Sequence, residues 1–213
     1  MSHPRSWRAV AAVLLTVLGA GCASETNPTD NCLPGVICTS GAAPTVAALN
    51  LPSGALLGTS VTFFAKKGED REGAIFFRNA EGEIEELVDF EVGANSLLTA
   101  PNGRAYVDGD SVAITMTLVG SGQLLFDFQP SGLRFNPNDP AELEIEYGDA
   151  TGGDINGDGV VNAVDAMLTA RLAIWLQERT ADPFFRLETS LNNATLEEIE
   201  ADVLGFTRYA IAY

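Results

Sequence analysis

The chain has 213 residues, of which 29 are acidic and 12 are basic, so its formal net charge is −17 at neutral pH. This acidic balance argues against binding to nucleic acid or to anionic membrane surfaces, because both carry negative charge. The length is enough for one well-buried domain or two small ones.

The N-terminus has the pattern of a signal peptide. Residues 1–8 carry two arginines, and residues 9–20 form an apolar run that is too short to span a bilayer. The run ends in Leu18-Gly-Ala-Gly-Cys22, which resembles the lipobox of bacterial lipoproteins. We therefore expect residues 1–21 to be removed as a lipoprotein signal peptide and Cys22 to become an acylated N-terminus. Ordinary signal cleavage with a free Cys22 thiol is the alternative.

Cysteine usage agrees with export. Once Cys22 is acylated, Cys32 and Cys38 remain, an even pair that is free to form a small disulfide loop. The resemblance implies a location in the bacterial cell envelope, at the outer membrane or cell surface, with the lipid as the only membrane contact. Residues 22–47 are rich in small and polar residues and have few large apolar side chains, which predicts a disordered tether.

Residues 48–213 are predicted to form one β-sandwich domain. Short stretches alternate between apolar and polar residues, and Gly, Asn and Pro separate them, as in sandwiches and barrels. In residues 141–147, an inward set of Leu143, Ile145 and Tyr147 alternates with Glu142, Glu144 and Glu146, which we expect to form a solvated face. The strands predicted in this way are residues 60–65, 74–78, 84–92, 111–119, 124–128 and 141–147.

The segment Pro130-Ser-Gly-Leu-Arg-Phe-Asn-Pro137 is similar to a segment of a known β-sandwich domain. Netrin receptors, ankyrins, tight-junction scaffold proteins and many bacterial surface lipoproteins share that domain. In the bacterial members the last strand often reads Phe, Ser or Thr, any residue, Tyr, Ala, as Phe206-Thr-Arg-Tyr-Ala210 does here. The resemblance covers residues 84–213 and implies an interaction or mechanical module.

Residues 154–165 have the spacing of a calcium-binding loop. Oxygen-bearing side chains stand at positions 1, 3, 5, 9 and 12, a glycine stands at position 6, and position 7 offers its carbonyl oxygen. Calcium takes six to eight oxygen ligands, and this spacing wraps them around one point. Val161 at position 8 is expected to anchor the loop to a core, and a glycine-rich turn that binds nothing is the alternative. The predicted ligands are Asp154, Asn156, Asp158, Val160 (carbonyl), Asn162 and Asp165.

The loop resembles those of EF-hands and, more closely, those of dockerin modules, which often close with Asp at position 12. A dockerin carries two such loops, each followed by a helix, and this sequence has one. Residues 162–170 are predicted to be a short helix with Asn162 as its N-cap. Residues 172–176 either continue that helix or begin a strand. The tail 205–213 is expected to be a closing strand, with a helical tail as the alternative. The loop is then an insertion in the sandwich.

A catalytic function is not expected. His3 lies in the signal peptide, so the mature chain has no histidine base and no histidine ligand for zinc. Acylated and paired cysteines leave no thiolate nucleophile. The sequence favours a calcium-binding, membrane-anchored, extracytoplasmic β-sandwich protein of structural, adhesive or interaction type, with a protein or polysaccharide partner. One alternative is a dockerin-like docking lipoprotein of a polysaccharide-degrading assembly. Another is a carbohydrate-active enzyme with a carboxylate pair, or a carbohydrate-binding module.

Overall fold

The computed structural model describes residues 36–37, 43–120 and 122–213, and within these ranges the fold is mainly β. The predicted signal peptide, Cys22, Cys32 and Cys38 lie outside the described residues. The helices are α1 (Gly148–Thr151) and α2 (Ala163–Thr169). The strands are β1 (Val36–Ile37), β2 (Ser60–Lys66), β3 (Arg71–Arg78), β4 (Ile84–Val92), β5 (Leu97–Thr99), β6 (Ser111–Leu118), β7 (Leu125–Gln129), β8 (Arg134–Phe135), β9 (Ala141–Glu146), β10 (Ala173–Gln177), β11 (Phe185–Leu187), β12 (Leu191–Asn193), β13 (Glu198–Val203) and β14 (Arg208–Ala212).

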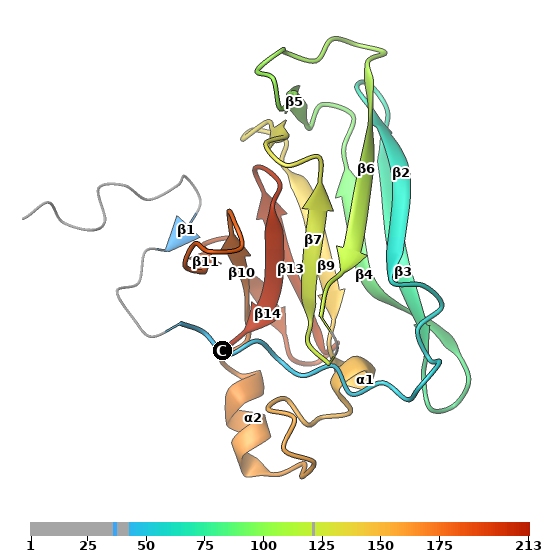
Figure 1. The fold of residues 1–213 in the computed structure, drawn as a ribbon, viewed down its shortest axis with the longest axis vertical. Helices are drawn as coiled ribbons and strands as arrows, with labels where there is room; N and C mark the ends of the chain where they lie inside the picture. Colours follow the sequence, from blue (N-terminus) through green and yellow to red (C-terminus); the bar gives the residue numbers. More distant parts are fainter. Residues whose placement is uncertain (1–35, 38–42, 121) are drawn as a thin grey trace, which may run out of the picture.

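Two antiparallel sheets form the layers of the fold, and β5 and β8 pair at one end (Figure 1). The seven-stranded sheet has the order β1-β11-β10-β14-β7-β6-β2, and the five-stranded sheet has the order β12-β13-β9-β4-β3. Aromatic side chains join the layers. The ring centroids of Phe90 in β4 and Phe128 in β7 are 5.2 Å apart, and that of Phe206 lies 5.1 Å and 5.3 Å from them. The arrangement is consistent with the predicted β-sandwich.

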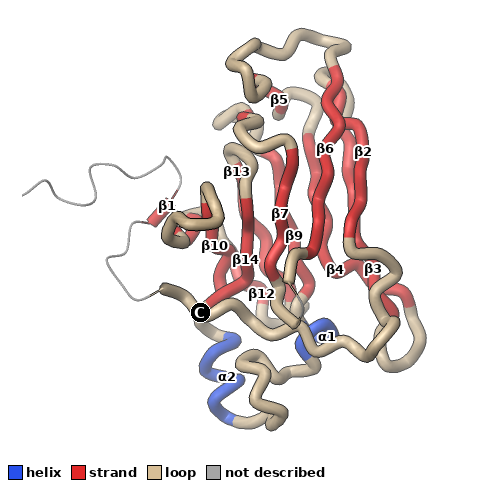
Figure 2. Tube along the Cα trace, in the orientation of Figure 1, coloured by secondary structure: helices blue, strands red, loops and turns tan. Residues whose placement is uncertain are grey.

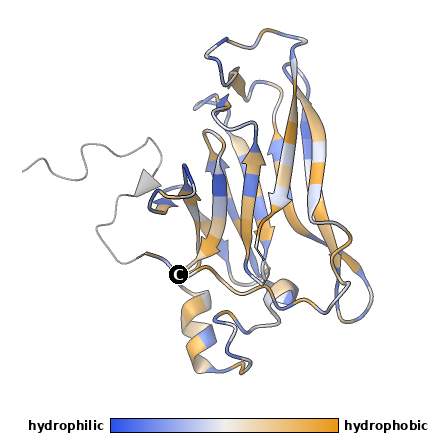
Figure 3. Ribbon diagram, in the orientation of Figure 1, coloured by the Kyte–Doolittle hydropathy of each residue, from blue (hydrophilic) through white to orange (hydrophobic). Residues whose placement is uncertain are grey.

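Alternating residue types decide which face of each strand points inward. In β9, Leu143 and Ile145 are fully buried, whereas Glu142 is exposed and Glu144 is partly exposed. Figure 3 shows the same alternation as hydrophilic and hydrophobic bands along the strands. The six strands predicted before the loop are confirmed as β2, β3, β4, β6, β7 and β9.

The chain after the loop returns to the seven-stranded sheet. Of the segment whose structure was left open, residues 173–176 lie in strand β10, and the tail contains the expected strand as β14. β14 lies between β10 and β7, so strands from before and after the loop are neighbours in one sheet. Tyr209 and Ile211 of β14 are almost fully buried. Ala210 and Ala212 are buried as well, so β14 is covered on both faces.

The ordered body begins before residue 48. Thr45 exchanges two backbone hydrogen bonds of 3.1 Å with Tyr213, and Ala47 is fully buried beside β14. Farther toward the N-terminus, β1 pairs with β11 inside the segment predicted as tether. The contacts cited here are backbone pairings and hydrogen bonds, so composition gives no sign of them. Residues 45–47 of the predicted tether therefore contact the seven-stranded sheet.

The helices are short and lie at one end of the sheets (Figure 2). The helix predicted over residues 162–170 is α2, and Asn162 is its N-cap as expected. In the part of the chain that the structure describes, neither helix is long and apolar enough to cross a membrane.

Candidate calcium site

The predicted calcium loop connects α1 and α2, between a strand of the five-stranded sheet and a strand of the seven-stranded sheet (Figure 1). The N-terminal segment attaches it to the sheets. The Ala48 N–H donates to the Ile155 carbonyl over 3.0 Å, and the Asn50 side-chain amide donates to the Asp154 carbonyl over 2.9 Å. Ile155 itself is buried in the core. The loop is therefore held at its first two positions.

Asp154, at loop position 1, lies at the centre of the turn. Asp154 is 9% exposed, and its two carboxylate oxygens accept hydrogen bonds from the N–H groups of Asp158 over 3.1 Å and Gly159 over 2.8 Å. Gly159 has a φ of 84°, in the left-handed region where a side chain is strained. Glycine at position 6 thus allows the chain to fold around the Asp154 carboxylate.

Asp165, at position 12, closes the loop from the first turn of α2. It is 2% exposed, and its carboxylate oxygens accept the N–H of Ile155 over 3.1 Å and the N–H of Asn162 over 2.9 Å. The second bond belongs to the capping box of α2. An aspartate is one methylene shorter than a glutamate, and it reaches these N–H groups because α2 begins at Ala163, before the loop ends.

The middle positions are joined by shorter-range contacts. Asn156 accepts the N–H of Asp158 over 2.9 Å, and Asp158 accepts the N–H of Val160 over 2.9 Å. Asn162 accepts the N–H of Val164 over 2.8 Å and donates to the Val160 carbonyl over 2.8 Å. Position 9 is therefore occupied by a helix cap, which suits the water-mediated contact that this position often makes.

The donor set fits a hard cation. All six predicted ligands offer oxygen, and three of them are carboxylates. Each carboxylate has about four lone-pair positions, so Asp154 and Asp165 keep acceptor capacity beyond the two N–H groups that each one binds. The six residues lie in the loop between α1 and α2, and their role as calcium ligands remains a prediction.

The expectation for position 8 is wrong. Val161 is 64% exposed, whereas Ile155 at position 2 is 1% exposed and reaches the core. Val161 lies against Gly153, where an added Cβ would be 3.3 Å from its nearest methyl carbon. The loop is attached through its start, so its position 8 remains in solvent.

A second acidic cluster lies on the outer face of the five-stranded sheet. Carboxylate oxygens of Glu142, Glu144 and Glu200 come within 4.8 Å of one another. Within the described residues, the carboxylates of the three loop aspartates do not come this close together. The register explains the cluster, since Glu144 stands opposite Glu200 on β13 and opposite Asp89 on β4. Like charges that face each other across strands are destabilising.

Protonation relieves part of this repulsion. Burial, together with nearby acids such as Glu86, raises the pKa of Asp89 to about 6. Burial and neighbours that include Glu85 and Asp149 raise the pKa of Glu146 to about 7. The face therefore takes up protons at mildly acidic pH.

The glutamates of β9 were expected to be a solvated face, and they are exposed or partly exposed. Sequence reasoning missed the carboxylates placed beside them. The signal was present, because Glu198, Glu200 and Asp202 occupy alternate positions as the acids of β9 do. Their pairing required knowledge of the strand order.

Comparisons of the chain with protein-family models, with curated proteins and with solved structures find no match. Any function assigned to the chain therefore comes from its own residues and their geometry.

Proposed function

We propose that this protein is a calcium-binding β-sandwich protein of structural, adhesive or interaction type, exported to the bacterial cell envelope and anchored there by lipid at Cys22. The observation that carries the proposal is the loop 154–165, in which two buried aspartates hold the turn at both ends. Calcium would be held by Asp154, Asn156, Asp158, Asp165 and the Val160 carbonyl, with Asn162 acting through water.

The ion would act by neutralising the loop aspartates and by fixing α2 to the segment that enters the sheets. A ligand that binds only the folded state stabilises it by RT ln(1 + [Ca²⁺]/Kd), about 1 kcal/mol at a few times Kd. For a single exported loop we expect a Kd on the order of 10⁻⁴ to 10⁻³ M.

Calorimetry and thermal melts with and without calcium test the site. Calcium should raise the melting temperature by about 2–4 °C. The increase should be lost in Asp158→Ala, because this variant removes a predicted ligand. Asp158 is exposed, so the variant should still fold. Glu144→Gln is the matched control, since it removes a carboxylate from the cluster on the sheet. A calcium response that survives Asp158→Ala and disappears in Glu144→Gln would place the ion on the sheet and contradict the proposal.

Mass spectrometry of the membrane fraction tests the anchor. A lipid-modified N-terminal peptide that begins Cys22-Ala23-Ser24 is expected. Soluble protein that is cleaved at another position, or membrane retention of a Cys22→Ala variant, would show that the anchor is not at this cysteine.

A dockerin-like docking function is the second candidate. It is favoured by apolar side chains that the loop and α2 leave in solvent: Val161, Val164 and Met167 are 64%, 45% and 62% exposed. This function predicts calcium-dependent binding to a cohesin domain, which Val164→Ser with Met167→Ser should abolish. Absence of binding at saturating calcium would remove this candidate.

A further inference from the structure

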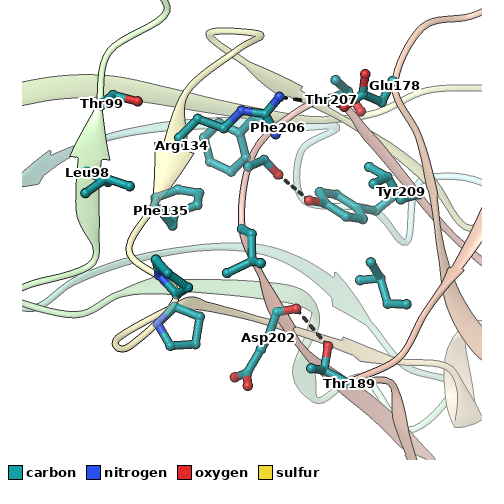
Figure 4. A pocket seen from close by; sticks show the side chains of 16 residues that line it. Leu98, Thr99, Arg134, Phe135, Glu178, Thr189, Asp202, Phe206, Thr207 and Tyr209 are labelled. Carbon is teal, nitrogen blue, oxygen red and sulfur yellow. Dashed lines mark hydrogen bonds and ion pairs between the residues drawn. The ribbon is translucent and has the colours of Figure 1, made fainter. Parts of the chain in front are cut away.

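A cavity of about 490 Å³ opens between the two sheets at the end where β8 lies (Figure 4). Most of its wall is apolar and comes from both layers. The chief apolar residues are Phe135, Leu176, Leu187, Leu204, Phe206 and Tyr209. Cavities of about 300–1,000 Å³ with mainly apolar walls and a few polar groups are typical of small-molecule sites.

Three of the four hydroxyl groups of the wall, all except that of Thr99, already have partners among the described residues. The Tyr209 hydroxyl donates to the Gly205 carbonyl, Thr189 donates to the Asp202 carbonyl over 2.8 Å, and Thr207 donates to the Gln177 carbonyl over 2.5 Å. Figure 4 shows the first two of these contacts as dashed lines. Because these donors are occupied by the backbone, the interior offers an apolar surface to a ligand.

Arg134 is the polar group that is positioned at the edge of this cavity (Figure 4). Its side chain is 52% exposed, and its guanidinium lies against Gly205, where an added Cβ would be 3.0 Å from Nη1. The nearest carboxylate oxygen, from Glu178, is 3.8 Å from Nη2, beyond hydrogen-bond distance. Among the described residues, this guanidinium makes an ion pair with Glu178 but gives no hydrogen bond to any acceptor, so a ligand carboxylate would compete with that ion pair alone.

The other acid of the wall does not compete for this position. Asp202 lines the cavity at its backbone, and its carboxylate points away from it (Figure 4). This agrees with its place on β13, where it is exposed between buried Ala201 and Val203.

We propose that this cavity binds a small amphipathic carboxylate, with an alkyl chain or ring between the sheets and its carboxylate on Arg134. The guanidinium presents a planar fork of donors that matches a carboxylate in bidentate geometry. Its charge complements an anion, and the apolar wall complements the body of the ligand. An aliphatic amine would need a carboxylate as its partner. The acid beside the opening, Glu178, faces Arg134 instead.

Calorimetry with decanoate, decanol and decylamine, each below its micelle concentration, tests the proposal on the folded chain. Decanoate should bind most tightly. Arg134→Gln should weaken decanoate binding about tenfold and leave decanol binding unchanged. Glu178→Gln should strengthen decanoate binding, because it removes a competing anion from the guanidinium. Arg71→Gln is the matched control, since Arg71 pairs with Glu69 and is not part of the wall.

Leu98→Trp provides a second variant that does not disturb the core. Leu98 lines the cavity and is 42% exposed, so a larger side chain there should obstruct the cavity and weaken binding of both decanoate and decanol. The proposal is overturned by no decanoate binding at millimolar concentration, by decylamine binding as tightly as decanoate, or by an Arg134→Gln variant with unchanged affinity. Dimerisation in sedimentation that Leu98→Trp abolishes would also overturn it, because a second copy would then fill the cavity.

Discussion

At the scale of single residues, Asp154 and Asp165 each have two functions in the loop. Their carboxylates order the backbone by accepting N–H groups, and the same carboxylates are predicted calcium ligands. Asp158, by contrast, is exposed and orders only its neighbours in the loop. Substitutions at these positions should therefore separate the folding contribution of the loop from its metal binding.

Asp165→Asn should lower the free energy of unfolding in chelator by about 1–3 kcal/mol, because one of the two N–H groups that Asp165 binds then faces an amide donor. Asp158→Asn should change stability in chelator by less than about 0.5 kcal/mol, as exposed substitutions usually do. Both should weaken the calcium response, because the neutral amide oxygen replaces a charged carboxylate ligand. Urea unfolding with chelator and with calcium measures the four values. Equal losses for the two variants in chelator would contradict the distinction.

At the scale of secondary-structure elements, strand register explains the acidic face. β9, β13 and residues 88–92 of β4 alternate acidic and apolar residues, and their pairing brings the acids into rows. The predicted loop ligands and most strands could be read from local spacing alone, because each depends on residues close in sequence. The rows of acids, and the contact of residues 45–47 with β14, depend on which distant strands become neighbours. Periodicity carries no information about that order.

The acidic face makes stability depend on pH. A carboxyl whose pKa is raised in the folded state binds more protons there than in the unfolded chain, so stability increases as pH falls through that window. For Glu146 the window runs from about 7 down to its ordinary value of 4.5. In chelator, the chain should melt at a higher temperature at pH 5.5 than at pH 7.5.

Glu146→Gln should raise stability at pH 7.5 by about 0.2–1 kcal/mol, since it removes a like charge opposite Glu198. It should also flatten the pH dependence, which thermal melts across this range would record. Glu188→Gln is a control at an acid outside this cluster. A wild-type melting temperature that falls steadily from pH 7.5 to pH 5.5 would contradict the assigned cause.

At the scale of the whole molecule, the strand order makes the two halves of the chain interdependent. β14 lies between β10 and β7 in one sheet, and β13 pairs with one edge of β9 in the other. A fragment of residues 48–148 would leave β7 and β9 with unpaired edges and would expose the core face beneath Phe206 and Tyr209. Such a fragment should not fold cooperatively, because burial of each large apolar side chain contributes about 1.5–3 kcal/mol. A cooperative melt with a β-type far-ultraviolet spectrum would show that residues 48–148 form a domain of their own.

The attachment of the loop to residues 48–50 has a mechanical consequence. Tension applied to the N-terminal end of the chain reaches the sheets first through the β1–β11 pair. It then reaches residues 45–50, which are bonded to β14 and to the loop through the Ala48–Ile155 contact. An ion in the loop would stiffen the second of these attachments. The force that extracts the N-terminal segment in single-molecule pulling should therefore rise when calcium is added. In an Asp158→Ala chain, the extraction force should be the same with and without calcium. Equal forces with and without calcium for the wild-type chain would contradict a mechanical effect of the ion.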